Sequence, residues 1–133
     1  MTSTPDAYVD TSALVKLVVA ERETPALEAD LTQRAGLLCS ALGAAELRRA
    51  CRRSLNRRQM SRVDEVLEAL FLVDVTPAIL DVAAELAPTT LRTLDAIHLA
   101  TVLSLDERSL DVITYDRRLA AAAASRGLSV VAP

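Results

Sequence analysis

The sequence predicts an α/β fold in which a central, mostly parallel sheet of about five short strands is flanked by helices. Short apolar segments of strand character alternate with helical segments, which is typical of βαβ units whose strands are parallel and covered on both faces. Apolar residues make up 51% of the 133 residues, enough for one domain with a proper core. Because no repeat, low-complexity tract or long linker divides the chain, we expect residues 1–133 to form a single domain.

In the first half of the chain, capping and turn residues set the boundaries of the expected elements. Thr11 and Ser12 can cap the helix after the first strand, and Thr24, followed by a proline, can cap the next helix. Gly36 ends that helix, and Asn56 closes or kinks the one that follows the second strand. The expected order is strand 7–9, helix 13–20, helix 24–34, strand 37–39 and helix 42–55.

The second half carries similar signals. Ser61 and Asp64 resemble a capping box at the start of a helix, Pro88 breaks the chain, and Thr93 can cap a long helix. Gly127 ends the last helix. The expected order is a helix from 61, strand 72–75, helix 77–87, helix 93–105, strand 111–115, helix 117–124 and strand 128–131.

Composition excludes several classes of protein. The formal net charge of −3 is not that of a polycation that coats nucleic acid, so any contact with RNA requires a local basic patch. The aromatic side chains Tyr8, Phe71 and Tyr115 are too few for the stacking platform of single-strand readers. Cys39 and Cys51 have neither metal-clamp spacing nor the density of a disulfide scaffold, so we expect both to be reduced packing residues.

The start of the chain lacks the basic and apolar regions of a signal peptide. No apolar run approaches the ~18 residues that would span a bilayer. We therefore expect a soluble, cytoplasmic protein with no membrane partner.

Four carboxylates stand where an apolar segment stops or a helix begins: Asp10, Glu46, Asp95 and Asp116. In an open α/β sheet, ligands bind outside the carboxyl ends of the strands, so the two aspartates that follow strands would lie along one rim. Carboxylates about 4 Å apart repel by up to ~4 kcal/mol at an effective dielectric constant of about 20, which favours partial protonation or a bound cation. An all-oxygen site in the cytoplasm indicates Mg²⁺ or Mn²⁺.

Such a site favours metal-assisted attack of water on a phosphodiester. The cation would orient the scissile phosphate, lower the pKa of its bound water and offset charge that develops on oxygen. A carboxylate that is not fully committed to the metal can take the proton of the water. The sequence does not indicate which of the four does so.

Three polar residues accompany the acids. Ser12 and Thr114 are cap and strand-end residues by the simpler interpretation, but either hydroxyl can orient water or a ligand, so both are candidate supporting residues. His98 follows Asp95 by three residues, yet an oxygen-only site has little use for imidazole. We therefore expect a structural role for His98.

A basic segment lies beside Glu46, with arginines at positions 48, 49, 52, 53, 57, 58 and 62. On one continuous helix, Arg53 and Arg57 fall within roughly 20° of the direction of Glu46, and Arg49 lies about 60° away. These three arginines are candidate RNA-binding residues. A solvated helix face and a contact with a partner protein are the alternative interpretations.

Four segments together resemble the PIN-domain ribonucleases, specifically the VapC toxins, in order, spacing and context: VDTSALVK at 9–16, AE at 45–46, LDAIHLA at 94–100 and ITYD at 113–116. The resemblance implies a PIN-like fold and an Mg²⁺- or Mn²⁺-dependent endoribonuclease, with Asp10, Glu46, Asp95 and Asp116 at the acidic positions of the family. It also implies a homodimer that is inhibited by a VapB-type antitoxin.

Other interpretations remain open at the level of the sequence. Asp10 and Asp116 can be helix caps, Asp95 can interact with a helix dipole, and Glu46 can pair with an arginine on a solvated face. A PIN-like module that binds RNA or protein without cutting is the main alternative function. A phospho-accepting receiver domain is disfavoured, because it needs a late lysine and the single lysine here is Lys16.

Overall fold

The computed structural model describes residues 4–53, 56–105 and 109–133. A five-stranded parallel sheet with helices around it confirms the predicted α/β class. The strands are β1 (Ala7–Val9), β2 (Leu37–Ser40), β3 (Phe71–Val73), β4 (Asp111–Ile113) and β5 (Ser129–Val131). The helices of the described residues are α1 (Thr11–Val18), α2 (Thr24–Thr32), α3 (Ala41–Arg52), α4 (Arg57–Glu68), α5 (Pro77–Glu85), α6 (Thr93–Ser104) and α7 (Arg117–Ser125).

The strand order is β3-β2-β1-β4-β5, and every neighbouring pair is parallel. The chain moves outward from β1 to β2 and β3, and then crosses to the other side of β1 to form β4 and β5. The order therefore reverses between β1 and β4, where Val9 pairs with Ile113. Ligands bind in open α/β sheets at such a switch point, outside the carboxyl ends of the strands.

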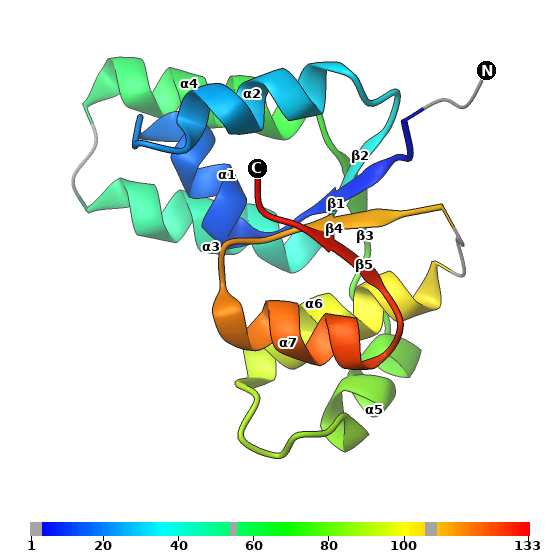
Figure 1. Cartoon of the computed structure of the whole chain (residues 1–133). Helices are drawn as coiled ribbons and strands as arrows, with labels where there is room; N and C mark the ends of the chain where they lie inside the picture. The colour runs from blue at the N-terminus through cyan, green and yellow to red at the C-terminus, as the bar shows by residue number, and fades with distance from the viewer. Residues whose placement is uncertain (1–3, 54–55, 106–108) are drawn as a thin grey trace.

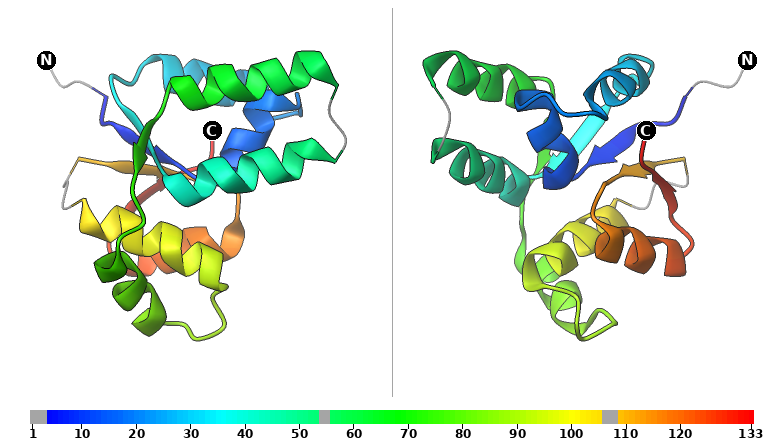
Figure 2. Two further views of the ribbon diagram at one scale, coloured as in Figure 1. Left: turned by 180° about the vertical axis from the view of Figure 1, so that it is seen from behind. Right: turned by 60° about the vertical axis from the view of Figure 1, so that its left-hand side comes forward.

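Helices cover both faces of the sheet, with α1 to α4 on one side and α5 to α7 on the other (Figures 1 and 2). Successive side chains of β1 point to opposite faces of the sheet, so they pack against both helical layers. Ala7 and Val9 join the core under α1 to α4, whereas Tyr8 packs with Val102 of α6. None of the helices formed by the described residues combines the length and apolar character that crossing a bilayer requires.

Three expected helix caps are wrong by one residue. Asp10 is the N-cap of α1, because its carboxylate accepts the backbone N–H of the first turn, so Thr11 and Ser12 are already helical. Thr24 and Thr93 are likewise the first residues of α2 and α6, and neither N-cap residue makes a side-chain capping bond.

The boundary between α3 and α4 differs most from the prediction. The expected helix 42–55 ends at Arg52, and its last two positions lie outside the described residues. Asn56 neither closes nor kinks that helix, because it forms a capping box with Gln59 that starts α4 at Arg57. The capping box expected at Ser61 is wrong, since Ser61 lies inside α4.

The strands are shorter than expected at the edge where the acids lie. β4 ends at Ile113, so Thr114 and Tyr115 belong to the connection between β4 and α7. β3 covers Phe71–Val73 instead of 72–75, and its exposed Phe71 marks it as an edge strand. These differences leave the order of elements unchanged.

Candidate active site

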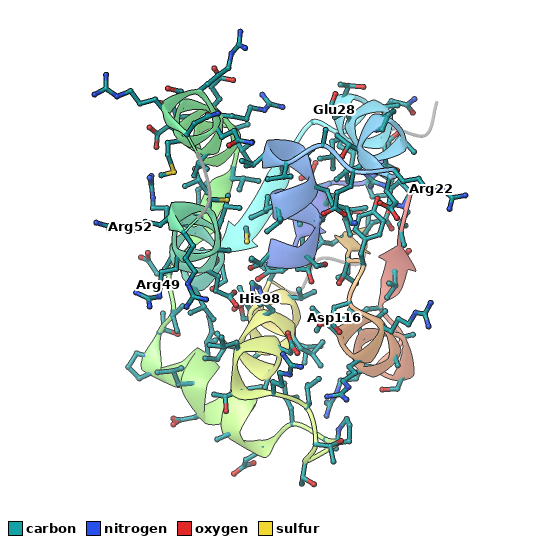
Figure 3. The ribbon with its side chains drawn as sticks, turned by 90° about the vertical axis from the view of Figure 1, so that its left-hand side faces the viewer. Arg22, Glu28, Arg49, Arg52, His98 and Asp116 are labelled. Carbon is teal, nitrogen blue, oxygen red and sulfur yellow. The ribbon has the colours of Figure 1, made fainter. Side chains whose placement is uncertain are left out.

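The four predicted acids come from separate elements at the carboxyl end of the sheet. Asp10 follows β1, Asp116 precedes α7, Asp95 lies in the first turn of α6, and Glu46 lies in α3. Figure 3 looks onto this end of the molecule, with His98 on α6 and Asp116 at the start of α7. Asp10 and Asp116 are linked through the hydroxyl of Thr114, and the charges of both contribute to a raised pKa of Asp95.

Asp10 is held at the switch point of the sheet and is only 3% exposed. Its Oδ1 accepts hydrogen bonds from Ser12 Oγ at 2.6 Å and from Ala13 N at 3.1 Å, and its Oδ2 accepts from Thr114 Oγ1 at 2.6 Å. Burial raises the pKa of Asp10 despite these donors, which act to lower it. The carboxylate is fixed in position but is costly to ionise.

Ser12 and Thr114, the two candidate supporting residues, connect β1 to the loop that carries Asp116. Ser12 Oγ accepts the Tyr115 N–H at 2.9 Å, and Thr114 Oγ1 accepts the Asp116 N–H at 3.0 Å. Both hydroxyls also donate to Asp10. They therefore set the position of Asp116 relative to Asp10.

Asp95 lies in the first turn of α6, and Asp116 lies at the start of α7. Asp116 Oδ1 caps α7 by accepting the backbone N–H groups of Arg118 at 2.9 Å and Leu119 at 3.0 Å. The Asp95 carboxylate has no hydrogen bond to the described residues. Burial, then the charge of Asp116 and, more weakly, that of Asp10 raise the pKa of Asp95.

Glu46 reaches the site through hydrogen bonds from two other elements. Its Oε1 accepts from Thr11 Oγ1 at 2.8 Å and contacts His98 Nε2 at 2.7 Å. Burial opposes ionisation, but the bonds from His98 and Thr11 outweigh it and lower the pKa of Glu46. The simple alternative, a carboxylate paired with Arg49 or Arg53 on a solvated face, does not describe this environment.

The sequence interpretation did not anticipate the hydrogen-bond partners of His98 or the part of Tyr8 among them. His98 is 2% exposed, and its Nδ1 lies 2.6 Å from the hydroxyl of Tyr8, which is fully buried. The spacing of Asp95 and His98 on one helical face was a signal for His98. Tyr8 gives no such signal, because in sequence it is one of three apolar residues in a strand.

Residues 7–125 match the sequence model of the PIN domain family. The chain belongs to the PIN domain family. The chain is 41% identical to the ribonuclease VapC46 of Mycobacterium tuberculosis over 132 residues. The aligned residues cover 95% of this chain and 96% of the relative. It is 35% identical to the ribonuclease VapC47 of the same species, with the same coverage.

Solved structures show the same PIN architecture. A toxin–antitoxin complex from Klebsiella pneumoniae contains a chain that is 25% identical, with a TM-score of 0.72 and coverage of 96% of this chain and 97% of that one. VapC20 of M. tuberculosis, described as a toxin that cleaves the sarcin–ricin loop, has a TM-score of 0.74 at 16% identity, with coverage of 96% and 99%. The latter similarity concerns the fold alone.

The carboxylate oxygens of this PIN site are the type of ligand that a hard divalent cation prefers. Carboxylates supply the ligands that Mg²⁺ and Mn²⁺ prefer, and a cation would lower the pKa of Asp95, which burial and then the charges of Asp116 and Asp10 raise. In the described ranges, however, no three His, Cys, Asp or Glu side chains have the spacing of a metal centre. The donor atoms of the site therefore fit such a cation, whereas the spacing of the side chains in the described residues does not by itself indicate a metal centre.

The candidate RNA-binding arginines do not lie on one helix. Arg49 lies in α3, Arg53 is its C-cap, and Arg57 is the first residue of α4, and all three are exposed. The angular argument that placed Arg57 next to Glu46 is therefore wrong, because it assumed a continuous helix. Figure 3 shows Arg49 and Arg52 projecting from α3 on one side of the acidic end of the sheet.

Proposed function

We propose that this PIN protein is an Mg²⁺- or Mn²⁺-dependent endoribonuclease that acts in the cytoplasm as the toxin of a VapBC-type pair. The observation that carries the proposal is that Asp10 and Asp116 follow the paired strands β1 and β4 at the switch point and are both hydrogen-bonded to Thr114 Oγ1, while the charges of both contribute to a raised pKa of Asp95. The identity of 35–41% to VapC ribonucleases over nearly the whole chain supports the reaction class.

In this proposal the protein supplies a fixed acidic pocket. Asp10, held by Ser12 and Thr114, and Asp116, held by the backbone of α7, would hold the cation together with Asp95 and Glu46. A bound divalent ion would activate water and offset charge on the phosphate oxygens. One of the four carboxylates accepts the proton that the attacking water loses.

Cleavage by the purified protein tests the proposal. Structured RNAs are incubated with the wild type in Mg²⁺, in Mn²⁺ and in EDTA, and we expect cleavage only with metal. Asp10→Asn should lower the rate by more than the roughly 10- to 100-fold that loss of an outer-sphere partner costs. Asp81→Asn, an exposed acid on α5, is the matched control and should cut at the wild-type rate.

Two outcomes would contradict the proposal. Absence of metal-dependent cleavage with any RNA would favour a PIN-like module that binds RNA or protein without cutting. Equal loss of activity in Asp10→Asn and Asp81→Asn would mean that the acidic pocket is not the reacting centre.

The partners in this proposal are an antitoxin and a second copy of the chain. The Klebsiella neighbour is part of a toxin–antitoxin complex, which supports a VapB-type inhibitor. Co-purification with the product of the adjacent reading frame, and inhibition of cleavage by it, tests this partner. Exposed Phe71, Leu80 and Val82 support a homodimer, which light scattering of the purified protein tests.

A further inference from the structure

A buried row of hydrogen bonds connects the middle of the sheet to Glu46. The Ser40 N–H donates to the Tyr8 hydroxyl at 3.0 Å, Tyr8 Oη lies 2.6 Å from His98 Nδ1, and His98 Nε2 lies 2.7 Å from Glu46 Oε1. The row joins β2, β1, α6 and α3. His98 extends from α6 to the place where α1 and α3 meet (Figure 3).

The chemistry of the end groups fixes the direction of these bonds. Ionised Glu46 can only accept, so His98 Nε2 must carry a proton. In the neutral ring, Nδ1 then accepts, and the Tyr8 hydroxyl must donate to it while it accepts from Ser40. Burial raises the pKa of Tyr8 well above its usual value, so the phenol keeps the proton that it donates.

The bonds to Glu46 converge on one of its two oxygens. Thr11 and His98 both contact Oε1, and Thr11 Oγ1 lies 3.3 Å from His98 Nε2, so these three groups form a compact set. Oε2 accepts no hydrogen bond from the described residues. A flexible glutamate is thereby held by one oxygen while the other remains available to a ligand.

We propose that His98 is a positioning residue, oriented by Tyr8, which holds Oε1 of Glu46 so that Oε2 is presented to the cation and the RNA phosphate. The inference rests on the proposed function of the acidic pocket and adds two residues to it. Gly43 is consistent with this role: a Cβ there would lie 3.3 Å from His98 Cε1, so the glycine lets α3 approach the imidazole ring.

NMR tests the direction of the bonds without any metal or RNA. The chain contains one histidine, so the two ring nitrogens give an unambiguous pair of ¹⁵N signals in a long-range ¹H–¹⁵N spectrum of the full-length protein. In the neutral ring we expect Nε2 to carry the proton and Nδ1 to be bare. A proton on Nδ1 of the neutral ring in the wild type would overturn the inference.

Matched tyrosine variants test the positioning role. Tyr8→Phe keeps the aromatic ring but removes the donor to Nδ1, so the ring is free to change tautomer and to turn a lone pair toward Glu46. We expect Mn²⁺ affinity of the RNA-free protein, measured by electron paramagnetic resonance, and the cleavage rate each to fall about 10- to 100-fold. Tyr115→Phe is the control, because the Tyr115 hydroxyl is buried without a partner among the described residues.

Variants of His98 give an independent measurement. The amide nitrogen of Gln can take the place of Nε2, so His98→Gln should retain more Mn²⁺ affinity than His98→Leu, which has no donor. Circular dichroism confirms that each variant is folded before its affinity is compared. Equal losses in the two variants, at equal melting temperature, would assign His98 a packing role and overturn the inference.

The outcomes separate this inference from the proposed function. If the wild type binds Mn²⁺ and cuts RNA but Tyr8→Phe behaves like Tyr115→Phe, the inference alone is wrong. If the wild type neither binds Mn²⁺ nor cuts RNA, the proposed function is wrong and the inference fails with it.

Discussion

Asp95 bears a carboxylate where the folded protein disfavours a negative charge. It is the acid of the site that lacks a hydrogen bond within the described residues, and its pKa is raised by burial, then by Asp116 and Asp10. Asp95→Asn removes this unfavourable charge and little else. We expect the melting temperature in EDTA to rise by about 2–4 °C, the shift that somewhat under 1 kcal/mol gives in a domain of this size.

The gain in melting temperature of Asp95→Asn should be largest at neutral pH and should decrease as the pH falls. Above the raised pKa, Asp95 is ionised in the folded protein and the gain is complete; as the pH falls toward 3.8, the folded protein protonates Asp95 and the gain disappears. Calorimetry between about pH 4 and pH 8 measures this, with Asp81→Asn as an indifferent control. A lower melting temperature for Asp95→Asn at neutral pH would mean that Asp95 stabilises α6 instead.

At the residue scale, the sequence predicted the acids but not the groups that hold Glu46. Asp10 and Asp116 follow strands and precede helices, and local patterns carry that signal. The partners of Tyr8 are 90 residues away at His98 and 32 residues away at Ser40. Only the fold brings such groups together, so no local pattern could have revealed them.

At the element scale, α3 depends on one close approach. A Cβ at Gly43 would clash with Sγ of Cys39, a fully buried side chain of β2. Gly43→Ala gains about 1 kcal/mol of helix propensity but forces a buried clash that typically costs about 1–3 kcal/mol. We expect a net loss of up to about 2 kcal/mol in urea unfolding.

Removal of the Cys39 sulfur atom, which a Cβ at Gly43 would meet, provides the control for this prediction. Cys39→Ala deletes the sulfur, so Gly43→Ala should cost less in a Cys39→Ala background than in the wild type, which a double-mutant cycle measures. Strict additivity of the two changes would show that the contact does not limit the packing of α3.

The start of α4 offers a direct comparison of two capping signals. Asn56 accepts the Gln59 N–H at 3.0 Å, so Asn56→Ala should destabilise the protein by about 1 kcal/mol. Ser61→Ala, at the position where the sequence suggested a cap, should be neutral or slightly stabilising, because alanine is the better helix former. Urea unfolding of the two variants measures both effects, and a larger loss for Ser61→Ala would contradict the observed start of α4.

At the scale of the whole molecule, the alternation of strands and helices was sufficient to predict a parallel sheet between helical layers. It did not predict that β1 lies in the middle, because strand neighbours depend on long-range pairing such as Ala7 with both Leu37 and Asp111. The same limitation affected the basic face, which is formed by the exposed arginines at the end of α3 and the start of α4. A continuous helix was assumed where α3 ends and α4 begins, so the relation of Arg57 to Glu46 had to come from the structure.

The basic face still leads to a prediction about charge, which does not require that α3 and α4 form one helix. With a net charge of −3, the protein as a whole gains little from phosphate attraction, so exposed arginines such as those of the basic face must supply it. Arg48 and Arg62 already pair with Asp64 and Glu65, whereas Arg53 and Arg57 form no ion pair with the described residues. These two are therefore available to the RNA backbone, one at the end of α3 and the other at the start of α4.

Replacing Arg53 and Arg57 together by alanine should weaken RNA binding and flatten its dependence on salt. Each lost contact with a single strand removes about 0.7 from the slope of log affinity against log salt, so two should remove about 1.4. Fluorescence anisotropy in Ca²⁺ or EDTA, over a range of KCl concentrations, measures binding apart from cleavage. Arg22→Ala with Arg126→Ala removes the same charge from exposed positions outside this face and should leave the slope nearly unchanged. Equal slopes for the two double variants would mean that net charge, and not this face, attracts the RNA.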